Sequence, residues 1–138
     1  MGDRRLAREL ALQALFYFDM EKGDPHEMMS QFRENLAEDT KESVSGFFNE
    51  LVQGVADHAA EIDGLLNTYS RNWRLTRMPV VDRNIMRIAV FELKYCPDIP
   101  ASVTINEAVE IGKKYGTRDS GAFINGVLDR VRLAEPLE

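Results

Sequence analysis

The stretch of residues 82–132 constrains the fold of this chain more than any other. Its first part, residues 82–95, is apolar around most of the circumference of a helix. The residues responsible are Ile85, Met86, Ile88, Ala89, Val90, Phe91 and Leu93. A helix with so little polar surface is typical of the buried centre of a domain. Pro97 and Pro100 are expected to end it, because proline has no N–H to donate and disfavours helical geometry in the residue before it.

Two amphipathic helices are predicted after these prolines. Thr104 and Glu107 have the spacing of a capping box at the start of the first helix. Gly116 stands where a left-handed residue commonly ends a helix, and Asp119 or Ser120 can cap the second. Small or apolar residues recur at helical spacing at Ile105, Ala108, Val109, Gly112 and Tyr115, then at Phe123, Ile124, Val127, Leu128 and Val131.

The N-terminal half also has helical periodicity. Residues 4–22 predict an amphipathic helix, and residues 26–38 predict a shorter one. The core contacts of this shorter helix are expected to be Met29, Phe32 and Leu36.

A long pattern over residues 44–66 steps by threes and fours, and Gly64 is expected to break it into two helices. His58 lies on its apolar stripe and is interpreted as a packed or surface histidine. We therefore predict an all-α fold of six to seven helices in two small packed helical bundles. The 138 residues form a single domain, with subdomains of approximately 1–70 and 71–138.

The composition narrows the functional classes. No segment approaches the roughly 18–20 apolar residues of a membrane span, and Glu9, Gln13 and Asp19 in the first helix exclude a signal peptide. Cys96 is the only cysteine, which excludes an internal disulfide and fits the cytoplasm. One cysteine and two separated histidines do not form a metal site, so no metal or cofactor is expected. No nucleophile–histidine pair or glycine-rich phosphate loop indicates an enzyme.

The net charge of −6 argues against nucleic-acid binding, but the charge is unevenly distributed. Residues 19–63 hold twelve acidic residues against three Lys or Arg, whereas residues 71–88 hold five Arg and one Asp. An acidic protein whose arginines are grouped in short patches can still bind a few phosphates, weakly and with a modest dependence on salt.

The first basic patch is Arg4, Arg5 and Arg8, in the first two turns of the first helix. The N-terminus of a helix attracts phosphate, because its free N–H groups and dipole add to the guanidinium groups. The alternative is a solvated, fraying terminus. The pattern alone favours the solvated terminus.

The second patch lies between the two halves of the chain. Arg71, Arg74 and Arg77 recur every third residue, with Trp73 among them. Basic residues with an interleaved aromatic can contact nucleic acid. We favour the other interpretation, a connector whose Trp73 is buried between the subdomains while the arginines pair with nearby acids.

A third candidate is the turn before the last predicted helix. Lys113, Asp119 and Ser120 offer a cation, an acceptor and a helix start. Phe123 follows one turn later, and its ring either packs in the core or stacks on an unpaired base.

Several runs resemble the NusB family of bacterial transcription antitermination factors. They are VVDRNIMRIAVFEL, IPASVTINEAVEIGKKYG and DSGAFINGVLDRV, together with the N-terminal RRLARELALQALFYFDM. The resemblance implies binding of boxA-type single-stranded RNA together with NusE, a small-subunit ribosomal protein, within an RNA polymerase antitermination complex that promotes ribosomal RNA transcription. The same fold occurs fused to ribosomal RNA methyltransferases, and no such domain is expected after Glu138.

The resemblance also assigns roles to residues. It implies that Arg4, Arg5 and Arg8 meet the RNA, with Asp119 and Phe123. It places Phe16, Met20 and Asp82 near the contact with NusE. Where the family usually has Asp-Ser-His-Lys-Phe, this chain has DSGAF, so two polar or cationic side chains are missing at 121 and 122. The sequence leaves open whether this weakens RNA binding.

Two other functions remain alternatives at this point. One is an accessory RNA-binding domain for a separate methyltransferase, and the other is a helical scaffold that binds protein alone. Some members of the family form homodimers that bury the RNA surface, and this sequence does not decide whether this chain does.

Overall fold

The computed structural model describes residues 2–21, 24, 27, 30–31, 40–71 and 73–135. Within them the chain is all-helical. The helices are α1 (Asp3–Glu21), α3 (Glu42–Asp57), α4 (Ala59–Tyr69), α5 (Val80–Tyr95), α6 (Ala101–Tyr115) and α7 (Ser120–Ala134), with a short 3-10 turn, η1 (Leu75–Arg77). The predicted all-α class is confirmed for this part of the chain. The helix expected at residues 26–38 lies mostly outside the described residues, as do its core contacts Met29, Phe32 and Leu36.

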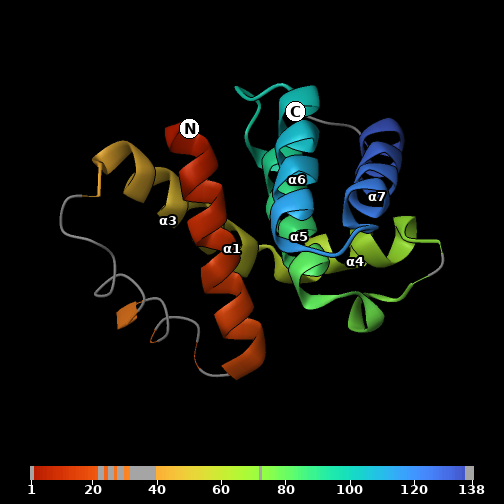
Figure 1. Ribbon diagram of the computed structural model, residues 1–138, viewed down its shortest axis with the longest axis horizontal. Helices are drawn as coiled ribbons and strands as arrows, with labels where there is room; N and C mark the ends of the chain where they lie inside the picture. The colour runs from red at the N-terminus through yellow and green to blue at the C-terminus, as the bar shows by residue number, and fades with distance from the viewer. Residues whose placement is uncertain are drawn as a thin grey trace.

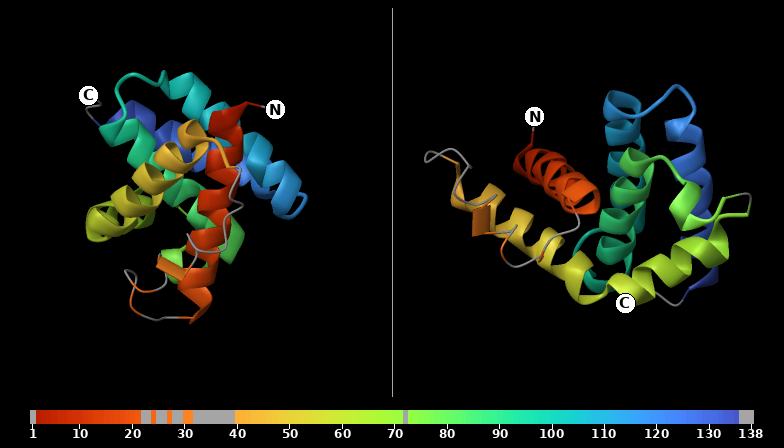
Figure 2. Two further views of the ribbon diagram at one scale, coloured as in Figure 1. Left: turned by 90° about the vertical axis from the view of Figure 1, so that its left-hand side faces the viewer. Right: turned by 90° about the horizontal axis from the view of Figure 1, so that it is seen from below.

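Helix α5 is the centre of the molecule, as its apolar circumference predicted. All seven of its apolar residues named above are buried, and α5 packs against α1, α3, α4, α6 and α7. Figure 1 shows α1 and α3 on one side of α5 and α7 and α4 on the other, and the view from below in Figure 2 agrees. Since α4 contacts both α5 and α7, the residues before position 70 are divided between the two sides. None of the described helices is long and apolar enough to cross a membrane.

Close packing of α3 against α5 explains one glycine. A Cβ built on Gly54 of α3 would lie 2.2 Å from the ring of Phe91 on α5. No side chain fits at that distance, so the absence of a side chain at residue 54 lets the ring of Phe91 lie against the backbone of α3.

The break in the long N-terminal pattern is at His58, so the expectation at Gly64 is wrong. His58 leaves helical geometry at φ −115° and ψ 23°, and its ring stacks on Tyr95 with centroids 4.1 Å apart. The ring of His58 at this break packs against α5, which agrees with the interpretation of His58 as a packed histidine. Gly64 lies inside α4, where a glycine costs only about 0.5–1 kcal/mol.

The predicted capping box is also wrong. Helix α6 begins at Ala101, four residues before the start that a cap at Thr104 would give, and it follows Pro100, whose fixed φ of −59° suits a helix start. Thr104 and Glu107 instead turn toward neighbouring helices. Gly116 is extended, with φ −95° and ψ −158°, and not left-handed. A side chain there would collide with Ser120, because a Cβ would lie 2.3 Å from its Oγ.

Candidate functional site

The first basic patch, Arg4, Arg5 and Arg8, is less accessible to solvent than its place at the start of a helix suggests. The Arg8 side chain is 4% exposed, and its Nε and Nη2 donate to the two carboxylate oxygens of Glu92 on α5 at 2.8 and 2.7 Å. The hydroxyl of Thr104 on α6 donates to the same carboxylate at 3.0 Å. Arg8 therefore joins α1, α5 and α6 in a buried network, and its guanidinium is closed to an incoming phosphate.

The other two arginines are progressively more accessible. Arg5 is 27% exposed and holds both carboxylate oxygens of Glu107 on α6, one of them through its Nε at 2.6 Å. This hydrogen bond holds the pKa of Glu107 below its ordinary value. Arg4 is 55% exposed and pairs with the exposed Asp98 at 3.2 Å, and its guanidinium lies 5.4 Å from the ring centroid of Phe47. Of the three arginines, Arg4 is the one most available to a ligand.

A second set of contacts brings the basic end of α6 onto α1. The Glu9 side chain is 5% exposed and accepts from Lys114 Nζ at 3.0 Å and from the Tyr115 hydroxyl at 2.6 Å. Lys113 points elsewhere: it is 65% exposed and pairs with Glu110 one turn away on its own helix, at 3.2 Å. The sequence patterns missed Glu9, because an acid near a run of arginines looks like ordinary surface charge.

The turn between α6 and α7 is held from inside by Ser120. Its hydroxyl donates to Asp82 Oδ1 on α5 at 2.7 Å and accepts from the Thr117 N–H at 2.9 Å. Both Ser120 and Asp82 are buried, and burial raises the pKa of the Asp82 carboxyl. Asp119 is exposed at the N-cap of α7 without capping the helix through its side chain. The predicted side-chain cap by Asp119 or Ser120 is therefore wrong.

Phe123 is half-buried, and its ring meets an unexpected neighbour. The Trp73 ring centroid lies 6.4 Å from that of Phe123, with the ring planes at 59°. Trp73 is 47% exposed, so the expectation that it is buried between the subdomains is wrong. Leu75 and Met78, both buried, occupy the interior position instead.

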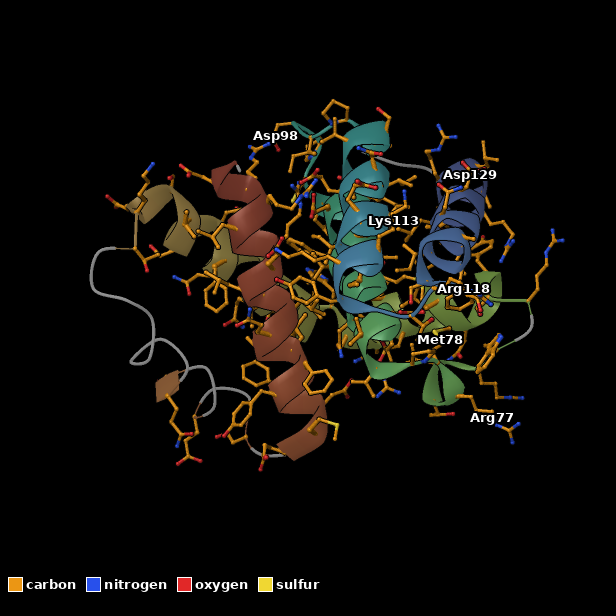
Figure 3. All side chains as sticks on the ribbon, viewed as in Figure 1. Arg77, Met78, Asp98, Lys113, Arg118 and Asp129 are labelled. Atoms are coloured by element: carbon orange, nitrogen blue, oxygen red, sulfur yellow. The ribbon has the colours of Figure 1, made fainter. Side chains whose placement is uncertain are left out.

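The arginines around Trp73 also depart from the favoured interpretation. Within the described residues Arg71, Arg74 and Arg77 form no ion pair, although pairing with nearby acids was expected. All three are exposed. The turn and this segment lie at the same end of α7. In Figure 3, Arg77 is at the lower right, Arg118 is above it on the right, Lys113 is near the middle on α6, and Asp98, the partner of Arg4, is at the top.

The candidate protein contact lies on α1. Phe16 and Met20 are 38% and 59% exposed, and Tyr17 beside them is 39% exposed, so three large apolar side chains face solvent along one helix. Asp82 does not share this surface, because it is buried against Ser120. Asp19, which the sequence patterns missed, ties this end of α1 to α5 through Arg83 and Arg87, both at 3.0 Å.

Comparison with known proteins gives consistent matches. The family model described as "NusB family" matches residues 5–132. "Transcription antitermination protein NusB" of Desulforapulum autotrophicum is 58% identical over 138 residues, covering 100% of this chain and 96% of that protein. The structure of T. maritima NusB superimposes with a TM-score of 0.87 at 36% identity, covering 98% of this chain and 93% of that one. A structure of antitermination factors NusB and NusE in complex with dsRNA has a TM-score of 0.83 at 26% identity, covering 98% and 99%.

Proposed function

The chain belongs to the NusB family, and from this we propose that it is an RNA-binding transcription antitermination factor that binds boxA-type RNA together with NusE. It promotes transcription of ribosomal RNA as part of the RNA polymerase antitermination complex, in the cytoplasm, by binding and not by catalysis. The similarity to a NusB chain solved with NusE and RNA supports both partners, because the shared fold spans nearly the whole of each chain.

The observation that carries the RNA site is the half-buried Phe123 ring beside a turn with exposed polar groups. Asp119 and Arg118 are both exposed next to it. A ring fixed on one side by a core and open on the other suits an unpaired base, and stacking contributes about 1–3 kcal/mol per base. The exposed Asp119 carboxylate serves as an acceptor for a base edge. Lys113 and Arg4 supply accessible cations for phosphates.

Arg5, Arg8 and Ser120 contribute to RNA binding by holding in place the residues that contact the RNA. Arg5 and Arg8 hold α1 against α5 and α6, which places Arg4 and Lys113 relative to one another. Ser120 holds the turn that carries Asp119. Because Gly121 and Ala122 lack polar side chains, more of the RNA affinity rests on Phe123 and on NusE.

The test of the RNA site is fluorescence anisotropy with a short boxA-like RNA, with and without NusE, at two salt concentrations. We expect tighter binding with NusE and weaker binding at higher salt. Phe123→Ala should weaken binding by about 5- to 150-fold, the range for one stacked base. Phe123→Leu keeps an apolar side chain in the same place and should lose nearly as much. Arg4→Glu should weaken binding, whereas Arg132→Glu, at an arginine that is 40% exposed near the C-terminal end of α7, should not. Failure of the unmodified chain to bind RNA with or without NusE would overturn the function.

NusE binding is proposed for the exposed surface of Phe16 and Met20, with Asp82 acting from the interior by fixing the N-terminus of α5. Phe16→Ala should weaken NusE binding about 30-fold or more, because an interface hot spot contributes about 2 kcal/mol or more, and should leave RNA binding by the chain alone unchanged. Leu133→Ala removes an apolar side chain that is 73% exposed on α7 and is the matched control. Isothermal titration calorimetry measures the affinity of each variant for NusE. If the Phe16 and Leu133 variants bind NusE equally well, the proposed contact at Phe16 and Met20 is refuted.

A further inference from the structure

A hollow of about 340 Å³ lies at the C-terminal end of α4 and in the segment that follows it. Its lining residues are Asn67, Ser70, Arg71, Trp73 and Arg74. The volume lies within the range of pockets that take small organic groups. Apart from Trp73 every lining residue is polar or charged, which suits a nucleotide better than an apolar peptide.

The two arginines that line this hollow do not pair with acidic residues of the described part of the chain. Arg71 and Arg74 are exposed and form no ion pair within the part of the chain that the structure describes. Six other arginines in that part contact a carboxylate, namely Arg4, Arg5, Arg8, Arg83, Arg87 and Arg132, whereas Arg130 donates to the backbone carbonyl of Tyr69. In a protein with a net charge of −6, adjacent guanidinium groups without an acidic partner leave a local positive site. Guanidinium groups bind phosphate through paired hydrogen bonds.

The aromatic wall of the hollow is continuous with the Phe123 ring. Trp73 is about half exposed and contacts Phe123 with ring centroids 6.4 Å apart. Indole is a strong stacking surface for unpaired bases, and stacking tolerates any base. An RNA strand whose base lies on Phe123 therefore meets Trp73 as it continues.

A polar group at the edge of the hollow lacks a partner. Ser70 is 6% exposed, and within the described residues its hydroxyl makes no hydrogen bond. Buried hydroxyls are nearly always hydrogen-bonded, and one without a partner is a candidate for a ligand contact. A base edge or a ribose hydroxyl would supply the missing partner.

We propose that this hollow is a second nucleotide subsite, which binds single-stranded RNA continuing from Phe123. Trp73 stacks on a base, Arg71 and Arg74 bind the adjoining phosphates, and the Ser70 hydroxyl bonds to the base or the ribose. The inference rests on the proposed RNA-binding function and extends its footprint from the α6–α7 turn to the end of α4.

The experiment uses the full chain and Trp73 as its own probe, because the chain has a single tryptophan. A minimal boxA-like RNA is compared with RNAs extended at the 5′ or 3′ end by about six nucleotides, within the length that one small domain covers. We expect one extended RNA to bind about fivefold tighter or more, the contribution of at least one stacked base. We also expect it to quench Trp73 fluorescence more than the minimal RNA does.

Two variants and their controls separate the subsite from a general effect. Trp73→Ala, and separately Arg71→Glu with Arg74→Glu, should bring the affinity for the extended RNA down to that for the minimal RNA. Leu133→Ala controls for the loss of an exposed apolar group. Lys41→Glu with Arg132→Glu controls for the same change of charge, and these two controls should keep the preference for the extended RNA.

The possible failures are distinguishable. If the minimal RNA binds but neither extension adds affinity or quenching, the subsite is refuted and the function at Phe123 stands. If no RNA binds, with or without NusE, the proposed function fails and the subsite fails with it. The signal of NusE with the Trp73→Ala variant is the background that is subtracted to obtain the fluorescence of Trp73. If NusE changes this fluorescence and RNA does not, the hollow is a protein contact and the inference is overturned.

Discussion

Replacing Arg8 with alanine is expected to destabilise the fold severely and not merely to remove an RNA contact. The substitution leaves the Glu92 carboxylate, whose side chain is 1% exposed, with Thr104 as its remaining partner across the helix interface. Removing one member of a buried ion pair typically costs about 3–5 kcal/mol. That is a large part of the about 5–15 kcal/mol by which folded domains are stable.

The size of this effect can be converted into a melting temperature. An unfolding entropy of about 2.1 cal/mol/K per residue over 138 residues amounts to about 0.29 kcal/mol/K. A loss of 3–5 kcal/mol therefore lowers Tm by about 10–17 °C. Thermal unfolding followed by circular dichroism measures this directly. Arg4→Ala is the matched control, because its exposed pair with Asp98 should contribute about 0–1 kcal/mol.

A double replacement tests the cause of the loss. Arg8→Met together with Glu92→Leu removes both buried charges, and exchange of a buried pair for apolar groups is often neutral or stabilising. We expect this variant to recover much of the lost Tm. The reasoning is refuted if Arg8→Ala melts like the unmodified chain while losing RNA affinity, since Arg8 would then be a phosphate contact and not part of the interior.

Two further predictions concern the core. Asp82→Asn keeps an acceptor for the Ser120 hydroxyl and removes a buried charge. Burial raises the pKa of the Asp82 carboxyl in the folded state above its ordinary value of 3.8. The carboxyl therefore destabilises the fold increasingly as the pH rises above 3.8. The variant should therefore gain stability relative to the unmodified chain at pH 7 and lose this advantage near pH 3.8, and thermal melts at the two pH values check this. Gly54→Ala should cost about 1–3 kcal/mol by overpacking, because its Cβ would lie 2.2 Å from an aromatic ring. Gly46→Ala, with no atom within 4 Å of the new Cβ, should be neutral or stabilising. Urea titration of the two glycine variants and the unmodified chain measures both effects.

The sequence predicts those parts of the fold that depend on local periodicity. The apolar circumference of residues 82–95 predicts the central helix α5, because a helix without a polar face has only the interior to occupy. The boundaries of α6 are less predictable from its sequence. Thr104 and Glu107 have the local spacing of a cap, but their hydrogen bonds go to α5 and α1, and tertiary contacts of this kind override local preference.

The site is harder to predict, because its arginines are partnered over long distances in the chain. Arg8 bonds to Glu92, 84 residues away, and nothing near Arg8 in the sequence indicates this. One signal was present: Glu92 is an acid within a helix predicted to be buried, and a buried carboxylate requires a cation or several donors. The burial of Trp73 was predicted wrongly, because aromatic residues in connectors are usually buried. Here Leu75 and Met78 occupy the interior, and Trp73 remains exposed.

We infer that, because Arg5 and Arg8 pair inward, the electrostatic part of RNA binding depends on Arg4, on Arg71 and Arg74, and on the α6–α7 turn. This shift is measurable, because each phosphate contact to a single strand contributes about 0.7 to the slope of log affinity against log salt. Arg71→Gln with Arg74→Gln should therefore reduce the slope for an extended RNA by about 1.4, and leave the slope for the minimal RNA unchanged. Arg5→Gln should change either slope little, because its guanidinium is held by Glu107. If the slope falls with Arg5→Gln and not with the double variant, Arg5 binds phosphate, Arg71 and Arg74 do not, and the reasoning is refuted.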